Sequence, residues 1–373
     1  MAFERRKSFL KARIMKKIIL ISAIVIAVII AGILVINRQD TDESPVTAGL
    51  ILNGSINDRS WSQSHYEGMM KTAEELGINL IYKENVPDEG LEAAADELIE
   101  QGSGIIICNS FGYGEYLDEV SAKYPDVYFF HASGVNSGNN VTTFFGRMYQ
   151  IRYLCGIAAG LQTKTNEIGY VAAFPISEVN RGINAFTLGV RSVNPEAEVY
   201  VSWTNSWVDD AAAENASESL MKNHNIDVLT MHVDSIKPLE AADRNGIMSI
   251  GYNFDNSGTY PESFLTAAVW SWENFYIPHI GECLTGKFNG KNYWDGVDTG
   301  IVSFAPLGDN ADSRIALRVA EQTQKMSEGI TDVFYGPVYD SEGNLRIAEG
   351  ESMSDIAMLN SFDWYVEGVV IDG

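Results

Sequence analysis

Short apolar runs alternate along most of this chain with segments of helical periodicity, and this alternation limits the possible folds more than any other feature. Continuous apolar runs, as opposed to runs that alternate apolar and polar, are typical of parallel strands covered by helices on both faces. In the first half, the predicted strands are 46–52, 79–83, 104–108 and 127–132, and the predicted helices are 62–76, 89–101 and 113–123. We therefore predict a doubly wound α/β unit.

The pattern begins again near residue 151. A second series of similar size follows, with strands 167–173, 198–203, 228–232 and 248–252, and helices 151–163, 178–193, 210–223 and 236–245. Two such series predict two parallel-sheet lobes joined by a hinge. A chain of 373 residues fits two domains at about 150 residues each.

Residues beyond the two series are assigned to both lobes. We predict a first lobe of 47–150 plus about 265–295, and a second lobe of 151–264 plus about 296–373. Helices are expected at 272–285 and 312–328, and GPVYDSEGNLR predicts a hairpin that turns at residues 341–343.

The N-terminus carries a membrane signal. Residues 18–36 form a run of 19 residues in which only Ser22 is polar, about 28 Å if helical and therefore close to the thickness of a bilayer core. Residues 1–17 are rich in Lys and Arg, which predicts a cytoplasmic N-terminus with the rest of the chain outside. Residues 37–46 are predicted to be a linker. We favour an uncleaved anchor on the outer face of a bacterial cytoplasmic membrane. A cleaved signal peptide, which would release the protein, remains the alternative.

The charge of the body excludes one class of partner. From Gln39 onward there are 18 Lys and Arg against 49 Asp and Glu, a net charge of −31. Such a surface repels phosphate backbones, so we predict no nucleic-acid binding. The three cysteines lie in apolar surroundings without tight spacing, which is typical of buried free thiols.

Polar and aromatic residues follow the predicted strands. Ligands of doubly wound sheets bind beyond the carboxyl ends of the strands, so these residues are the candidate site. Aromatic faces can hold a flat ring, while amides and carboxylates read its edge. The candidates are Asn57, Asp58, Trp61, Asn109, Ser110, Phe111, Arg181, Trp207, His232, Asp234, Asn253, Asp255 and Trp270.

Structural roles compete with these assignments. One of Asn57, Asp58 and Ser60 is expected to cap the helix that begins near Trp61. Trp61 and Trp207 could be core residues, but both lie in polar turns, so we favour ligand stacking for each. His232 is more readily explained as a hydrogen-bonded pocket or core residue than as a general base.

Catalytic and metal signals are weak. The histidines are scattered, no nucleophile and base are paired by motif, and no phosphate-binding glycine motif is present. The aspartates of the strand ends are separated by long stretches, which argues against a metal site. We therefore predict a protein that is not an enzyme and that has neither a metal nor a cofactor.

Several dispersed motifs resemble one known family. GSINDRSWSQ (54–63) is similar to its G-x-N-D-x-S-F-N-Q, and KTNEIGYVAAFPISEVNRGINAFTLGVRSVNP (164–195) is similar to its second-lobe signature. SWVD (206–209) and IGYN (250–253), the latter with Asp255, match two shorter motifs in the same order. Across residues 46–373, the chain thus resembles the basic membrane protein (Bmp) family, the PnrA-like purine-binding proteins of ABC transporters.

The resemblance implies a type I periplasmic-binding-protein fold that closes over a purine. Trp61 and Trp207 would then sandwich the ring, and the turns at 57–58, 109–111 and 253–255 would supply polar contacts. The implied partners are an ABC permease and its ATPase, and we predict a monomer.

Departures from the family pattern refine the predicted ligand. Trp270 stands where the nucleoside receptors carry a lysine that reaches the ribose, and Asn253 replaces an aspartate. These changes favour a nucleobase such as adenine over a nucleoside, with riboflavin or another flat heterocycle as a lower alternative. A membrane-anchored sensor of the same fold without a transport role is the alternative function.

Overall fold

The structure is a computed structural model that describes residues 45–372. The predicted anchor, its basic flank and nearly all of the linker lie outside these residues. Within 45–372, no helix is both long enough and apolar enough to cross a membrane.

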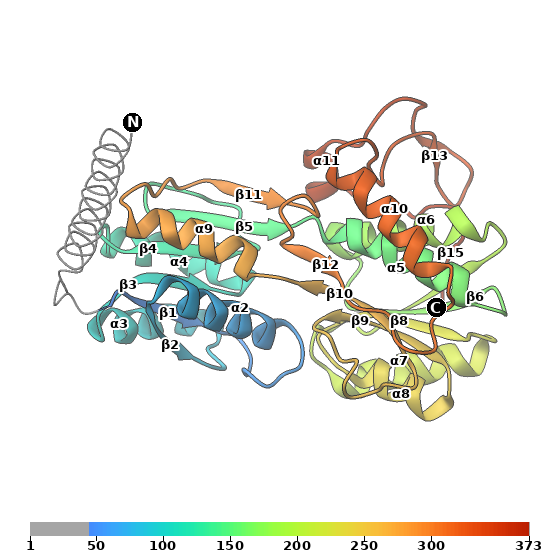
Figure 1. Cartoon of the computed structure of the whole chain (residues 1–373), viewed down its shortest axis with the longest axis horizontal. Helices are drawn as coiled ribbons and strands as arrows, with labels where there is room; N and C mark the ends of the chain where they lie inside the picture. The colour runs from blue at the N-terminus through green and yellow to red at the C-terminus, as the bar shows by residue number, and fades with distance from the viewer. Residues whose placement is uncertain (1–44, 373) are drawn as a thin grey trace, which may run out of the picture. The chain divides into compact units, whose positions relative to one another are not determined.

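The first lobe is built on a six-stranded parallel sheet (Figure 1). Its strands, in spatial order, are β11 (Asn292–Asp295), β5 (Val141–Gly146), β4 (Tyr128–Ala132), β3 (Ser103–Cys108), β1 (Thr47–Ile51) and β2 (Asn79–Lys83). Its helices are α2 (Trp61–Leu76), α3 (Leu91–Glu100), α4 (Gly114–Lys123) and α9 (Glu273–Leu284). Central strands such as β3 are buried along nearly their whole length, as the continuous apolar runs predict.

The second lobe is built on a seven-stranded sheet, parallel except for one edge strand. Its strands are β12 (Val302–Phe304), β10 (Phe264–Trp270), β9 (Met248–Asn253), β8 (Val228–His232), β6 (Glu167–Ala172), β7 (Glu198–Trp203) and β15 (Val369–Ile371). Its helices are α5 (Met148–Gln162), α6 (Ser177–Val193), α7 (Asp210–Asn223), α8 (Lys237–Asn245), α10 (Ile315–Ser327) and α11 (Asp355–Asn360). The predicted hairpin is present as β13 (Val338–Tyr339) and β14 (Leu345–Ile347), which pair antiparallel.

Helices α5 and α6 are packed unusually closely because glycines lie at their contact. A Cβ atom at Gly156 of α5 would collide with the carbonyl group of Phe186, and one at Gly189 of α6 would collide with that of Tyr153. This close pair fixes the beginning of α6, where part of the candidate site lies.

The chain passes between the two sheets three times. It crosses between β5 and α5, between β10 and α9, and between β11 and β12 (Figure 1). Strand β10 pairs with β9 and β12 of the second sheet, so its residues belong there and not to the first lobe, where the sequence places residues from about 265. Residues 148–150 likewise begin α5 of the second lobe. Strand β10 is not predicted from the sequence, because FLTAAVW runs directly into the tryptophan-rich start of the next helix and no turn residue marks where the strand ends.

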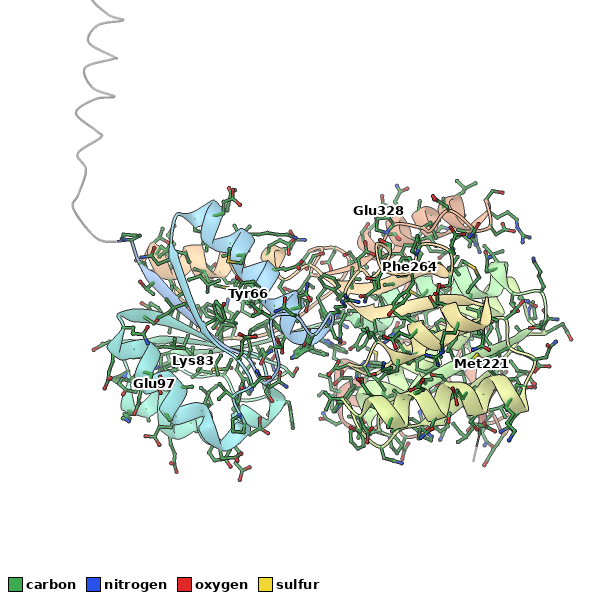
Figure 2. The ribbon with its side chains drawn as sticks, turned by 90° about the horizontal axis from the view of Figure 1, so that it is seen from below. Tyr66, Lys83, Glu97, Met221, Phe264 and Glu328 are labelled. Carbon is green, nitrogen blue, oxygen red and sulfur yellow. The ribbon has the colours of Figure 1, made fainter. Side chains whose placement is uncertain are left out.

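The largest cluster of buried apolar side chains contains residues of both lobes, such as Leu50 of the first and Tyr170 of the second. Figure 2 shows Tyr66, Lys83 and Glu97 in the first lobe, and Met221, Phe264 and Glu328 in the second. Lys83 and Glu97 form an ion pair at the surface, whereas Phe264 is fully buried beneath the second sheet.

Candidate ligand-binding cavity

A cavity of about 460 Å³ lies where the two lobes meet, beyond the carboxyl ends of their strands. This volume is within the range of about 300–1,000 Å³ that small-molecule sites occupy. It is lined by Asn53, Trp61, Asn109, Ser110, Phe111, Ser133, Gly134, Val135, Phe145, Glu178, Arg181, Trp207, Asp234, Tyr252, Asn253, Asn292, Tyr293, Trp294, Leu359 and Asn360.

Trp61 forms part of the first-lobe wall. It is the first residue of α2, and its indole Nε1 donates a hydrogen bond to the carbonyl oxygen of Asn109 at 2.8 Å. Behind it, His65, Trp272 and Trp270 form a continuous stack, with ring centroids 4.2 Å and 4.3 Å apart. Trp61 meets all three rings edge to face. The ring is therefore held in one orientation by packing as well as by its hydrogen bond.

The turn between β1 and α2 has a structural role at Asp58. Its carboxylate accepts hydrogen bonds from the backbone amides of Ser60, Ser62 and Gln63 at 2.8, 2.8 and 3.0 Å. These amides are among the unpaired donors at the start of a helix, so Asp58 caps α2. Burial raises the pKa of Asp58, and the amide hydrogen bonds oppose that change. Neither Asp58 nor the exposed Asn57 lines the cavity, which corrects their prediction as readers of a ring edge.

The two predicted amides line the cavity but are already hydrogen-bonded within the protein. Asn109 Oδ1 accepts from the backbone amide of Asn53, and its Nδ2 donates to Ser62 Oγ. Asn253 Oδ1 accepts from Trp270 Nε1 at 2.9 Å, and its Nδ2 donates to Asp234 and Ser60. Asn253 also has a positive φ of 67°, a conformation that asparagine tolerates better than most residues. Both amides therefore position other groups of the wall.

Charged groups line the second-lobe wall. Glu178 and Arg181 project from the first turn of α6, and Arg181 Nη1 donates to the carbonyl oxygen of Met358 at 2.6 Å. Asp234 follows β8 and accepts hydrogen bonds from Asn253 and Ser60. Burial, together with the nearby Asp58 carboxylate, raises the pKa of Asp234 to about 7. Burial also raises the pKa of Glu178, although Arg181 and Arg152 act in the opposite direction.

Trp207 is the aromatic residue of the second-lobe wall that the sequence identifies. It is partly buried, and its ring packs 6.0 Å from Phe174 and 5.9 Å from His232. Its carbonyl oxygen accepts from the backbone amide of Asp234 at 2.7 Å. This bond fixes the tryptophan turn against the strand end that carries the carboxylate.

Three other predicted residues lie outside the cavity. His232 is buried behind the wall, where its Nδ1 is 3.3 Å from the hydroxyl of Tyr170 and burial holds its pKa well below the ordinary value. Trp270 is buried in the stack behind Trp61. Asp255 is exposed and accepts from the amide of Ser257 in a local turn. The cavity is lined by the other eight predicted residues, which are Trp61, Asn109, Ser110, Phe111, Arg181, Trp207, Asp234 and Asn253. Their contact with a ligand remains a prediction.

Sequence reasoning missed several lining residues. Glu178 had a usable signal, because it lies in the helix start that follows strand 167–172, beside the predicted Arg181. Leu359 and Asn360 had none, because α11 reaches the cavity only through tertiary packing, with Asn180 Nδ2 donating to the carbonyl oxygen of Phe362. Phe145, Tyr252 and Trp294 also line the cavity. Tyr252 falls in the predicted strand 248–252, and no predicted element covers Phe145 or Trp294.

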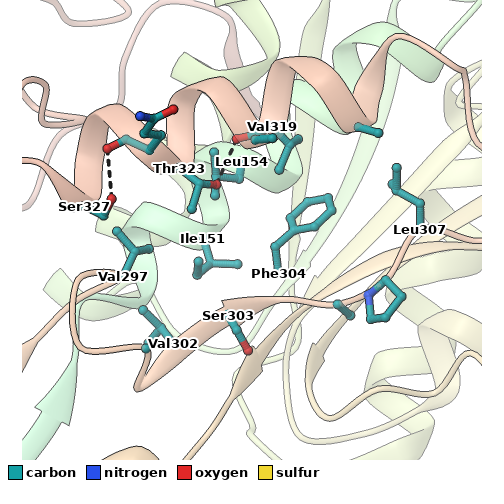
Figure 3. Close-up of a pocket in the computed structure, with 16 residues that line it drawn as sticks. Ile151, Leu154, Val297, Val302, Ser303, Phe304, Leu307, Val319, Thr323 and Ser327 are labelled. Atoms are coloured by element: carbon teal, nitrogen blue, oxygen red, sulfur yellow. Dashed lines mark hydrogen bonds between the residues drawn. The ribbon is translucent and has the colours of Figure 1, made fainter. Parts of the chain in front are cut away.

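A second, larger hollow lies on the second lobe, between α10 and β12 (Figure 3). Its volume is about 750 Å³, and Ile151, Leu154, Val319 and Phe304 are among the side chains around it. No charged residue of the described chain lines it, and the hydroxyl of Thr323 bonds to its own helix. Its polar side chains already have hydrogen-bond partners in the protein, so we place the candidate site between the lobes; they are Ser303, Thr323, Gln324 and Ser327. Residues 45–372 contain no cluster of His, Cys, Asp or Glu suited to a metal ion.

The fold and the cavity together define a class of protein. Two doubly wound lobes that enclose a cavity beyond their strand ends are the arrangement of type I periplasmic binding proteins, which confirms the predicted fold class. The sequence profile of the Bmp family, described as ABC transporter substrate-binding protein PnrA-like, matches residues 46–332. The chain belongs to this family, and it is an ABC transporter solute-binding protein. The family implies a small-molecule ligand, permease and ATPase partners, and an extracytoplasmic location.

Individual relatives differ in their named ligands. A purine-binding protein of Brucella abortus (strain 2308) is 32% identical over 332 residues, which cover 88% of this chain and 93% of the relative. A protein of Haloferax volcanii, provisionally named an ABC transporter glucose-binding protein, is 32% identical over 325 residues, which cover 87% and 80%. The crystal structure of a transcriptional activator of the comK gene from Bacillus halodurans superposes with a TM-score of 0.68 at 23% identity, covering 76% of this chain and 99% of that one. This last likeness shows the fold alone.

Proposed function

We propose that the protein binds a purine in the cavity between its lobes and delivers it to an ABC permease. The observation that carries this proposal is the placement of Trp61 on the first-lobe wall and Trp207 on the second, with carboxylates beside them. Aromatic faces suit a flat ring, and stacking of a base on an aromatic side chain contributes about 1–3 kcal/mol. The purine-binding relative from Brucella abortus supports the same ligand class.

Within this class we favour a nucleobase such as adenine over a nucleoside. No lysine lines the cavity within residues 45–372, whereas the nucleoside receptors of the family use one to hold the ribose. Trp270, at the corresponding place, donates its indole hydrogen to Asn253 and stacks on Trp272. Its ring supports the wall and offers no cation to a sugar.

Binding can be tested by calorimetry and tryptophan fluorescence on the full-length protein. We expect adenine to bind and to quench the fluorescence, and adenosine to bind at least about tenfold more weakly. Glucose and riboflavin serve as the contrasting ligands. If glucose binds and no purine does, the proposal is wrong, and the ligand class of the Haloferax volcanii relative applies instead.

The route of attachment and the cellular role are part of the proposal. We assign the run at 18–36 to an uncleaved anchor that holds the binding unit outside the membrane. Loss of purine uptake in cells that lack the protein is the expected result for a transport role. Normal uptake in those cells would favour the sensor alternative.

A further inference from the structure

The polar side chains that line the cavity differ in whether their atoms already have hydrogen-bond partners in the protein. The side chains of Asn109 and Asn253 have protein partners for both their oxygen and their nitrogen. The Glu178 carboxylate lines the same cavity but accepts no hydrogen bond from any residue of the described chain. A buried or partly buried carboxylate without a partner is costly, so its site calls for a donor from elsewhere.

Within the described chain, the basic nitrogen nearest to the Glu178 carboxylate is too far away to donate a hydrogen bond to it. His232 Nε2 lies 3.9 Å from Glu178 Oε1, beyond hydrogen-bond distance, and this nitrogen has no partner in the described chain. The Glu178 side chain keeps 32% of its surface exposed, whereas that of His232 keeps 3%. The open part of the carboxylate therefore belongs to the cavity, and the imidazole closes the space behind it.

Two guanidinium groups surround this carboxylate. Arg181 is three residues further along α6 and is 4% exposed, and Arg152 is fully buried beneath the wall. Burial raises the pKa of Glu178, and both guanidinium groups oppose that change. The ionised form that they favour only accepts hydrogen bonds, so the complementary ligand group is an N–H or amino donor.

We propose that Glu178 accepts a hydrogen bond from an exocyclic amino group of the bound heterocycle, and that it thereby selects an amino-substituted purine. This inference rests on the proposed purine-binding function and adds the residue that reads the substituent. A hydrogen bond to a charged group, together with the penalty of leaving that group unpaired, corresponds to about 10- to 100-fold in affinity.

The test compares adenine with unsubstituted purine, which lacks only the amino group. Calorimetry on the full-length protein should show adenine binding at least about tenfold more tightly than purine. In Glu178→Met this ratio should fall to within about threefold. Glu178→Gln, which keeps a neutral acceptor, should give an intermediate ratio. Glu196→Met is the matched control, because it makes the same substitution at an exposed carboxylate of the same lobe that does not line the cavity, and it should keep the wild-type ratio.

The ratio separates recognition from structural damage. A variant that only disturbs the fold weakens both ligands equally, so an unchanged ratio in Glu178→Met would overturn the inference. Near-equal binding of adenine and purine to the wild type would also overturn it, while leaving purine binding intact. If the wild type binds neither ligand, the proposed function fails and this inference fails with it.

Discussion

The first-lobe wall and the second-lobe wall of the cavity differ in how their polar groups are partnered. On the first, Trp61 and Asn109 are fixed by hydrogen bonds and by the stack of His65, Trp272 and Trp270. On the second, Glu178 has no hydrogen-bond partner among residues 45–372, and Asp234 lies in surroundings that disfavour its charge. The difference suggests a division of work, in which one wall supplies a rigid stacking surface and the other supplies chemical discrimination.

The largest expected effect comes from removing the support of the rigid wall. Trp272 is fully buried and is stacked between the rings of His65 and Trp270, so Trp272→Ala should lower the free energy of unfolding by about 3–5 kcal/mol. Urea denaturation followed by circular dichroism measures this change. Trp272→Phe keeps an aromatic ring in the stack and should lose less than half as much. Equal losses in the two variants would show that the stack does not stabilise this wall.

Removing the stacking surface itself should weaken binding without changing selectivity. Trp61→Ala is expected to reduce adenine affinity by about 10- to 100-fold, because stacking on one base contributes about 1–3 kcal/mol. The adenine-to-purine ratio should stay as in the wild type, since stacking does not read the amino group. A ratio that changes in Trp61→Ala as it does in Glu178→Met would contradict the division between the walls.

The discriminating wall should carry a dependence of stability on pH. The pKa of Asp234 is raised in the folded state from an ordinary 3.8 to about 7, so folding favours its protonated form. Its contribution to stability is therefore complete below about pH 4 and is lost as the pH rises through about 7. Asp234→Asn cannot ionise, so it should be more stable than the wild type at pH 8 by about 1–3 kcal/mol, and this gap should narrow to less than half by pH 5 and close only below about pH 4.

Urea denaturation at both pH values measures the gap. Because groups far from residue 234 titrate equally in both proteins, the difference between them reports Asp234 together with its coupling to Asp58 and Glu178. A gap that is the same at pH 5 and pH 8 would contradict the raised pKa.

The smallest effect is expected at the tail that completes the cavity. Arg147 donates two hydrogen bonds to Asp355 of α11, at 2.9 and 2.6 Å, but Asp355 is 52% exposed. Exposed ion pairs contribute little, so Asp355→Ala should cost less than about 1 kcal/mol in thermal or urea unfolding. Asp363→Ala, at an exposed position of the same tail, is the control. A larger loss in Asp355→Ala alone would show that α11 is held mainly by this pair.

The parts that the sequence predicts well are those set by local pattern. Four strands of each sheet, most of the helices and the hairpin at 336–346 follow from apolar periodicity and turn residues. The expectation that ligands bind beyond the strand ends also predicts one shared site for Trp61, Asn109, Arg181 and Asp234. These residues are far apart in the chain, and all four line the cavity.

The remaining features depend on tertiary contacts that have no local signature. Sequence alone could not decide which residue of the turn at 57–60 would cap α2, and Asp58 takes that role. It could not show that Trp270 would turn toward Trp272 and away from the cavity. Nor could it place α11 against α6, because that contact joins segments about 180 residues apart.

The three chain crossings between the sheets restrict what the cavity can do. With a single connection, two lobes could twist and slide freely, but three neighbouring connections leave essentially one rotation, about the line that runs through them. Trp270 and Trp272 flank the middle crossing, and the ring of Trp270 would obstruct a Cβ atom at Gly146, beside the first crossing. The packed rings at two of the three crossings therefore add a further restraint on how one lobe can move against the other.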